Sequence, residues 1–235
     1  MARAPVAAEI EELPEADRLA GFPHPRMTAR LYGHVEAERN LAEAFASRMH
    51  HAWLLTGPPG IGKATLAYRV ATFLLARPDE RDMFGASLDI GTEASASRQV
   101  RALSHPGLLV IRRPYDPKSK KHRSEITVDE VRRIKSFLGL TANEDAWRAV
   151  IVDAADELNA LLKSLEEPPK RTVFLLVSSS PGGLLATIRS RCRTLSLSGL
   201  SGEDLKKAVQ QAILASGDEI GQGAMPDPSE WGALE

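Results

Sequence analysis

The stretch "GPPGIGKATLA", residues 57–67, decides the fold. An apolar run, 52–57, leads into it and a helical pattern, 62–76, follows it, which is the context that a phosphate-binding loop requires. The glycines can place successive backbone N–H groups around a phosphate, and the N-terminus of the following helix adds a partial positive charge. Lys63 would reach the terminal phosphates. The predicted nucleotide site therefore contains Gly57, Pro58, Pro59, Gly60, Ile61, Gly62, Lys63, Ala64 and Thr65.

One position departs from the loop pattern. Ala64 directly follows Lys63, where a Ser or Thr hydroxyl would ligate Mg²⁺. Thr65 lies about 100° further around the helix, and we do not expect it to substitute. Three interpretations stay open: a nucleotide site, a disabled site that holds ATP or ADP weakly, and a tight glycine turn that binds nothing.

Apolar runs of strand length recur along the chain and are near-continuous, as in strands buried on both faces of a parallel sheet. Helical patterns alternate with them, so we predict an α/β fold with right-handed crossovers. The runs are 52–57, 108–113, 148–154 and 171–178, and the helical patterns are 34–48, 62–76, 126–140 and 157–169. Thr127 and Glu130 have the spacing of a capping box, which predicts a helix start near Val128.

The third apolar run ends in Asp153, which is placed to hold a Mg²⁺-bound water as a Walker B aspartate does. Asp153 therefore joins the predicted nucleotide site, although a strand-end carboxylate can also simply cap the next loop. Active ATPases of this kind usually place a glutamate next, to orient the attacking water, and here the next residue is Ala154. Ala64 and Ala154 together indicate a fold built to hydrolyse nucleotide that lacks the groups that do so.

A second candidate site follows the fourth apolar run, at the tripeptide Ser190-Arg191-Cys192. An arginine stays charged in proteins and forks onto phosphate oxygens, so Arg191 could act on a neighbouring subunit's γ-phosphate as an arginine finger in trans. The alternative is a surface salt bridge. Cys192 reads as a small buried apolar residue.

Composition limits the class of protein. The chain has 235 residues, 43% hydrophobic and 26% charged, and a net charge of −1, so any nucleic-acid contact must come from a local patch. Its single cysteine excludes an internal disulfide and argues against a cysteine zinc site. No apolar run approaches the roughly 20 residues that span a bilayer, and the N-terminus lacks a signal-peptide core. We expect a cytoplasmic protein without membrane partners.

Composition also changes along the chain. We predict a flexible leader at 1–25, a P-loop domain at 26–198, and the start of a helical lid domain at 199–235. Within the P-loop domain, 112–127 is basic and broken by prolines, and it reads as an exposed loop or hairpin tip. It could contact the DNA backbone or an acidic partner, although such a run is usually a solvated loop; its basic residues are Arg112, Arg113, Lys118, Lys120, Lys121 and Arg123.

The order "HAWLLTGPPGIGKATLA", "VIVDAADELN", "ALLKSLEEPPKRTVFLLVSSSP" and "LLATIRSRC" resembles the AAA+ subunits of the bacterial DNA polymerase III clamp loader. Among them it is most similar to the delta-prime subunits, in the form seen in alphaproteobacteria. The resemblance covers about residues 25 to 200. It implies a five-stranded parallel sheet and a stator role in DNA replication, with gamma/tau and delta subunits as partners. The sliding clamp and primed DNA would be reached through the complex, and Arg191 would complete the ATP site of the adjacent gamma/tau subunit.

Departures from that family qualify the expectations. Many members carry a four-cysteine zinc module after the first helix, and this chain has no cysteine there, so we expect no zinc and no required cofactor. Family members usually have more residues where Asn159 runs straight into Ala160. Either the helix after Asp153 begins late or residues are absent from this sequence. The family's helical collar domain is also expected to be missing from these 235 residues.

Three functions compete at this point. The first is a non-hydrolysing stator subunit of the polymerase III holoenzyme with a degenerate ATP site. The second is an active AAA+ ATPase of the gamma/tau or helicase type, against which Ala64 and Ala154 stand. The third is a nucleotide-binding or sensor domain without an assembly role, which makes no use of Arg191.

Overall fold

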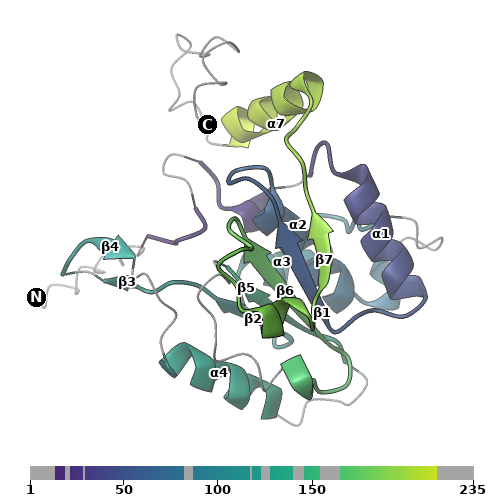
Figure 1. The fold of residues 1–235 in the computed structure, drawn as a ribbon. Coiled ribbons are helices and arrows are strands. Elements are labelled where there is room, and N and C mark those ends of the chain that lie inside the picture. The colour runs from purple at the N-terminus through teal and green to yellow at the C-terminus, as the bar shows by residue number, and fades with distance from the viewer. Residues whose placement is uncertain are drawn as a thin grey trace, which may run out of the picture.

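The computed structural model of the chain describes residues 14–18, 22–28, 30–81, 87–116, 118–122, 128–139, 146–153 and 165–215. Five parallel strands form its central sheet, in the order β2-β5-β6-β1-β7 (Figure 1). The strands are β1 (Ala52–Thr56), β2 (Leu108–Ile111), β5 (Arg148–Val152), β6 (Thr172–Ser178) and β7 (Arg193–Ser196). The expected five-stranded parallel sheet is confirmed.

The fifth strand, β7, is the one that no apolar run marked in the sequence. It lies at the edge of the sheet beside β1, and its residues are mostly exposed. An edge strand with an exposed face does not need the continuous apolar sequence of a buried central strand. β1 and β6, by contrast, are buried at every position.

Helices cover both faces of the sheet. Those with described bounds are α1 (Val35–Ala46), α2 (Lys63–Leu75), α3 (Ser95–Arg101), α4 (Val128–Gly139), α6 (Ala186–Arg189) and α7 (Gly202–Ala215), with 3-10 turns η1 (Pro25–Met27) and η2 (Pro78–Glu80). The predicted helices at 34–48, 62–76 and 126–140 are confirmed, and α4 begins at the predicted Val128. Most of the predicted helix 157–169 lies outside the described residues. The short α3 and α6 have too few turns to show a periodic pattern.

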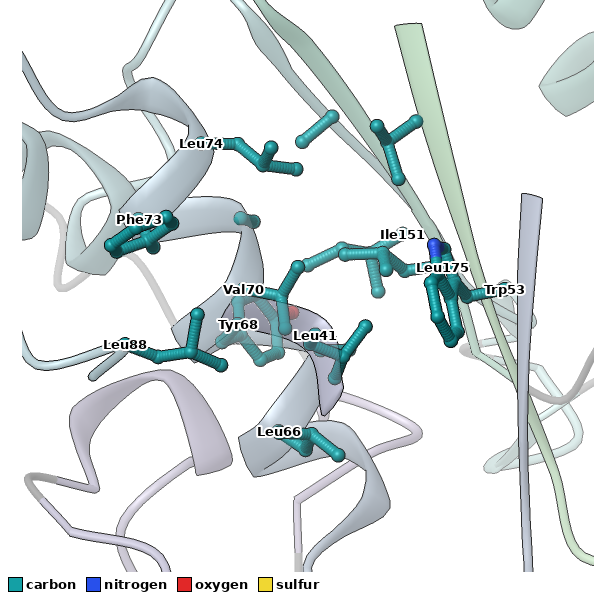
Figure 2. Close-up of a cluster of buried hydrophobic side chains, with 14 of the residues drawn as sticks. Leu41, Trp53, Leu66, Tyr68, Val70, Phe73, Leu74, Leu88, Ile151 and Leu175 are labelled. Carbon is teal, nitrogen blue, oxygen red and sulfur yellow. The ribbon is translucent and has the colours of Figure 1, made fainter. Parts of the chain in front are cut away.

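Alternate strand residues feed two apolar cores, one on each face of the sheet. In the first core, Trp53, Ile151 and Leu175 of the sheet meet side chains of α1 and α2, among them Leu41 and Val70 (Figure 2). The second core lies on the opposite face and includes residues of α4 and α6. Each fully buried large apolar side chain stabilises the fold by about 1.5–3 kcal/mol, so these cores fix the sheet that carries the loops.

The basic segment after β2 forms a small antiparallel hairpin, as the sequence indicated for its tip. Strand β3 (Tyr115–Asp116) pairs with β4 (Lys121–His122), and Lys118, Lys120 and Lys121 are exposed. Arg123 lies outside the described residues. The prediction of an exposed loop is wrong for Arg112. Its side chain is mostly buried and is bonded to residues near the N-terminus.

The predicted flexible leader at 1–25 also differs from what is seen. Residues 14–18 and 22–25 pack against the sheet domain, and the Asp17 side chain is only 2% exposed. The physical reason is a set of ion pairs with Arg112, whose position 95 residues further along gives no local sequence signal. The rest of the leader lies outside the described residues.

Helix α7 lies at the start of the region 199–235, for which the sequence predicted helix, and Ser201 Oγ accepts a hydrogen bond from the backbone N–H of Asp204 at 3.2 Å. Residues 216–235 lie outside the described part, so the boundary of a lid domain at 199 stays a prediction. Across the described helices, none is both long enough and apolar enough to span a membrane.

Candidate functional site

The glycines of the 57–67 stretch adopt backbone conformations that other residues reach with strain. Gly57, Gly60 and Gly62 have φ angles of 139°, 78° and 100°. A Cβ on Gly57 would lie 2.3 Å from the Leu197 carbonyl oxygen, so no larger residue fits there. At Gly60 no atom lies within 4 Å of the Cβ position, so this peptide borders open space that a ligand can approach.

Lys63 is the first residue of α2 and is 5% exposed. Its Nζ donates hydrogen bonds to the carbonyl oxygens of Gly57 at 2.7 Å and Pro58 at 2.5 Å, so the ammonium is held inside the loop. His34, also buried, donates from Nε2 to the Ile61 carbonyl oxygen at 2.7 Å and ties the same loop to the start of α1. His34 carried no signal in the sequence, because it opens a helical pattern like any polar residue.

A cleft of about 560 Å³ lies beside this loop, within the roughly 300–1,000 Å³ of small-molecule sites. It brings together most of the predicted site with residues of the strand ends and the N-terminal segment. Its lining is Ala16, Asp17, Pro23, Pro25, Thr28, Pro59, Gly60, Gly62, Lys63, Ala64, Thr65, Arg113, Asp153, Val177 and Ser179. Gly57, Pro58 and Ile61 belong to the loop but not to the lining of the cleft.

Asp153 and the loop face one cleft although they follow different strands. The Asp153 backbone N–H donates to the Ile111 carbonyl oxygen at 2.9 Å, which continues the pairing of β5 with β2. Ala154 lies outside the described residues. A glycine cradle, a helix N-terminus and a lysine are the donors that phosphates require, so a nucleotide's phosphates fit the chemistry of this cleft.

A divalent cation fits it less well. The loop has the methyl group of Ala64 where the metal-ligating hydroxyl would stand, and Thr65 is 8% exposed. Asp153, which lines the cleft, is the carboxylate that the sequence assigned to the Mg²⁺-bound water. Within the described ranges, no group of three or more His, Cys, Asp and Glu side chains is arranged to hold a metal ion.

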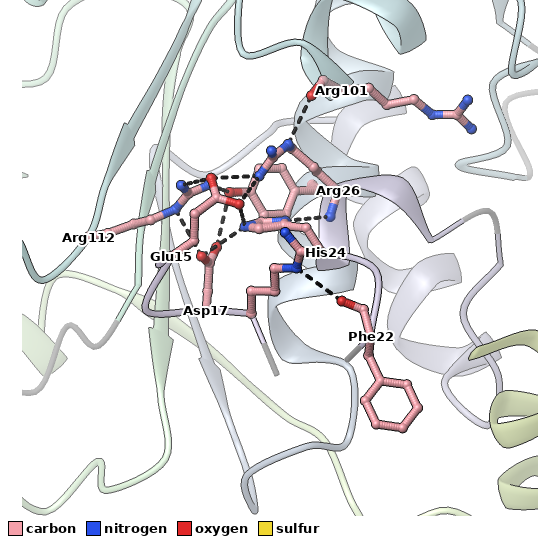
Figure 3. Close-up of polar contacts among 9 residues, drawn as sticks. Glu15, Asp17, Phe22, His24, Arg26, Arg101 and Arg112 are labelled. Carbon is pink, nitrogen blue, oxygen red and sulfur yellow. Dashed lines mark hydrogen bonds and ion pairs between the residues drawn. The ribbon is translucent and has the colours of Figure 1, made fainter. Parts of the chain in front are cut away.

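Ion pairs and hydrogen bonds hold the N-terminal segment, whose Asp17 and Pro25 line the same cleft. Figure 3 shows these polar contacts. Arg112 Nε lies 3.0 Å from Asp17 Oδ1, and its Nη1 lies 2.5 Å from Glu15 Oε1. Arg112 Nη2 donates to the Tyr68 hydroxyl oxygen at 2.7 Å. We call Glu15, Asp17, His24, Arg26, Tyr68 and Arg112 the Arg112 cluster.

The Arg112 cluster sets the ionisation of its own members. Burial alone would raise the pKa of Asp17, but the hydrogen bond with His24 and the charge of Arg112 outweigh it and hold the pKa below its usual range. Burial lowers the pKa of His24, and its hydrogen bond with Asp17 offsets this only in part. His24 Nδ1 accepts the Arg26 N–H at 3.0 Å, so the neutral ring carries its proton on Nε2, toward Asp17 at 2.8 Å.

Arg113 has a different environment from Arg112, its chain neighbour. It lines the cleft, and its Nε is buried with no hydrogen-bond partner within the described part of the chain. The sequence placed both arginines in one exposed basic stretch. No local signal separated them, because both follow the end of β2 at Ile111 and the alternation of side-chain directions is fixed only within a strand.

Arg191 follows α6 and does not belong to the lining of this chain's cleft. Its Nη2 lies 2.7 Å from Glu166 Oε1, and its Nη1 donates to the Thr187 carbonyl oxygen at 2.8 Å. The side chains of Arg191 and Glu166 are 34% and 48% exposed. The guanidinium is therefore oriented but open to approach. Cys192 packs against the second core, and burial raises the pKa of its thiol to about 11.

Comparison with known proteins gives a consistent assignment. Residues 34–201 match the family model described as "DNA polymerase III, delta subunit". The chain is 38% identical over 148 residues to the DNA polymerase III subunit delta' of Pseudomonas aeruginosa, covering 60% of this chain and 41% of that protein. For the subunit delta' of Escherichia coli (strain K12) the identity is 34% over 164 residues, with 66% and 45% covered.

Among solved structures, the gamma subunit-related DNA polymerase III protein of Thermotoga maritima aligns over 79% of this chain and 59% of its own. The TM-score is 0.46 and the sequence identity 19%. The chain spans less than half the length of the two delta' relatives.

Proposed function

The chain belongs to the delta-prime family of DNA polymerase III subunits, and on this premise we propose that it is the stator of a clamp loader. In this role it would stand beside gamma/tau and delta subunits and help to place the sliding clamp on primed DNA. It would hydrolyse little or no ATP itself. Its catalytic contribution would be Arg191, offered to the ATP site of the adjacent subunit.

The observation that carries the proposal is the placement of Arg191. A guanidinium that served its own P-loop would border its own cleft, and Arg191 does not. Instead it lies at the surface, held by one exposed carboxylate and one backbone carbonyl oxygen. An arginine finger acting in trans needs this combination of a fixed direction and solvent access, because the phosphate arrives with another subunit.

The residues of the chain's own cleft also support a subunit that hydrolyses little or no ATP itself. Ala64 removes the loop hydroxyl that would ligate Mg²⁺, and Ala154 stands in place of the glutamate that would orient water. We therefore propose that Gly60, Gly62 and Lys63 hold ATP or ADP as a structural ligand.

The test is reconstitution of the full-length protein with its gamma/tau and delta partners. We expect Arg191→Ala to lower ATP hydrolysis at the site of the adjacent gamma/tau subunit by up to about 10³-fold, the scale attributed to arginine fingers. Arg191→Lys should recover little, because the lysine lacks the planar fork. Arg77→Ala removes a 66% exposed arginine and serves as the matched control. An unchanged rate in an intact Arg191→Ala complex would remove Arg191 from the mechanism.

The protein alone supplies the second half of the test. Turnover near 1 s⁻¹, the low end of typical enzyme rates, would contradict a stator and favour an active ATPase of the gamma/tau type.

A further inference from the structure

We propose that Arg113 is a phosphate-binding residue of the cleft, and that Arg113 and Lys63 together let the cleft bind a nucleoside di- or triphosphate without Mg²⁺. This goes beyond the stator function, which depends on Arg191 and on a different surface. It concerns what the chain's own cleft holds, and by which groups.

The pairing of β2 with β5 brings Arg113 and Asp153 to the same edge of the sheet. Strand β2 pairs with β5 in a register that sets Ile111 beside Val152, so the residues that follow these two strands emerge together. Asp153 follows β5, and Arg113 comes two residues after the end of β2. Both line the cleft together with residues of the glycine loop. In a P-loop protein the cation lies between the loop hydroxyl and the strand aspartate.

The hydrogen bonding of Arg113 is incomplete in the described structure. Its Nε atom is buried and has no acceptor there. A buried donor without an acceptor is costly, and such groups are commonly completed by a water, an ion or a ligand. Arg112 differs in its partners: its Nη1 and Nη2 bond to Glu15 and Tyr68, and its Nε, which also has no hydrogen-bond acceptor, is ion-paired with Asp17. A phosphate oxygen in the cleft would give Arg113 Nε an anionic partner comparable to those of Arg112.

Charge balance supports the same assignment. A phosphate entering the cleft would meet the carboxylate of Asp153, whose repulsion a metal-dependent site neutralises with Mg²⁺. Ala64 lacks the hydroxyl that would help to ligate that cation. Arg113 supplies a permanent positive charge to the same lining, in which Asp17 is paired with Arg112 and His24.

The experiment is calorimetric titration of the full-length protein with ADP, ATP and pyrophosphate, each in EDTA and in excess Mg²⁺. We expect ADP and ATP to bind in EDTA, with affinities changed less than about threefold by Mg²⁺. Arg113→Ala should weaken binding roughly 10- to 100-fold in both buffers, the equivalent of one charge-assisted hydrogen-bonding group. Arg113→Lys should recover part of this loss, and Arg77→Ala should bind as the wild type does.

Pyrophosphate separates recognition of phosphate from recognition of the nucleoside. If the Arg113 effect is also present with pyrophosphate, the residue contacts phosphate as proposed. Unfolding curves of each variant show whether a loss of binding is a loss of fold, and Arg113→Met provides a second uncharged side chain of greater length. Binding that requires Mg²⁺, no binding in EDTA, or wild-type affinity in folded Arg113→Ala would each overturn the proposal. None of these outcomes bears on Arg191.

Discussion

Arg112 and Arg191 are the two most informative arginines of this chain, and their surroundings differ in every respect. Arg112 is 16% exposed and contacts Glu15, Asp17 and Tyr68. Arg191 is twice as exposed and contacts one surface carboxylate and one carbonyl oxygen. The difference teaches how to separate a structural arginine from an available one. A guanidinium paired with buried carboxylates holds segments of the protein together, whereas one whose only carboxylate partner is exposed can exchange that partner for a phosphate.

The sharpest way to break this comparison is to remove Arg112. We expect Arg112→Ala to lower the free energy of unfolding by about 3–5 kcal/mol, because Asp17 would stay buried without its arginine and Glu15 would keep only Arg26. Urea unfolding at neutral pH measures it. Arg77→Ala, at a 66% exposed site, should change the same quantity by less than about 1 kcal/mol. Equal small effects of both variants would show that the Arg112 cluster does not stabilise the fold.

Asp17 offers a smaller and pH-dependent effect. We expect Asp17→Asn to cost about 1.5–3 kcal/mol at pH 7, the contribution of a hydrogen-bonded charge. The pKa of Asp17 in the fold lies below its ordinary value of 3.8. Its stabilisation is therefore complete above pH 3.8 and is lost as the pH falls through the folded pKa.

The measurement for Asp17 is the difference in unfolding free energy between wild type and Asp17→Asn, taken from pH 7 down to pH 3. The difference should hold constant above the ordinary pKa and shrink below it. Asp79→Asn, at a 74% exposed site, is the matched control. A difference that grows as the pH falls would have the wrong sign for this assignment.

The smallest expected effect is on the other side of the comparison. Arg191→Ala and Glu166→Gln should each change the unfolding free energy by less than about 1 kcal/mol, because exposed ion pairs contribute little. A double-mutant cycle of the two, followed by chemical denaturation, measures their coupling. A coupling of several kcal/mol would class Arg191 with Arg112 as a structural residue and weaken the case for a finger acting in trans.

The predictable parts of this molecule are those in which local pattern and physical role coincide. The glycine loop, the buried strands and the start of α4 at Val128 each follow from residues within one short window. Strand β7 was not predicted from the sequence, because it is an edge strand and has no continuous apolar run. The Arg112 cluster was not predicted either, because Glu15 and Arg112 are 97 positions apart and no local sequence pattern pairs them.

The candidate site divides in the same way. Gly60, Gly62, Lys63 and Asp153 were predictable, since phosphate cradles have a strict order of strand, loop and helix. Arg113 and His34 were not, because their contribution depends on which direction a side chain leaves the backbone. Periodicity states that direction only inside regular elements, and Arg113 lies just beyond one.

The sheet order also dictates when this chain can fold during synthesis. The neighbours of β1 are β6 and β7, and the hydroxyl contact between Thr56 and Ser196 spans 140 positions. When the ribosome has synthesised β1 and the phosphate loop, it has not yet made β6 or β7, the two strands that pair with β1. Strand β1 therefore pairs with its neighbours only after more than half of the described chain has been made. Until then, nascent intermediates expose a strand that the fold buries at every position.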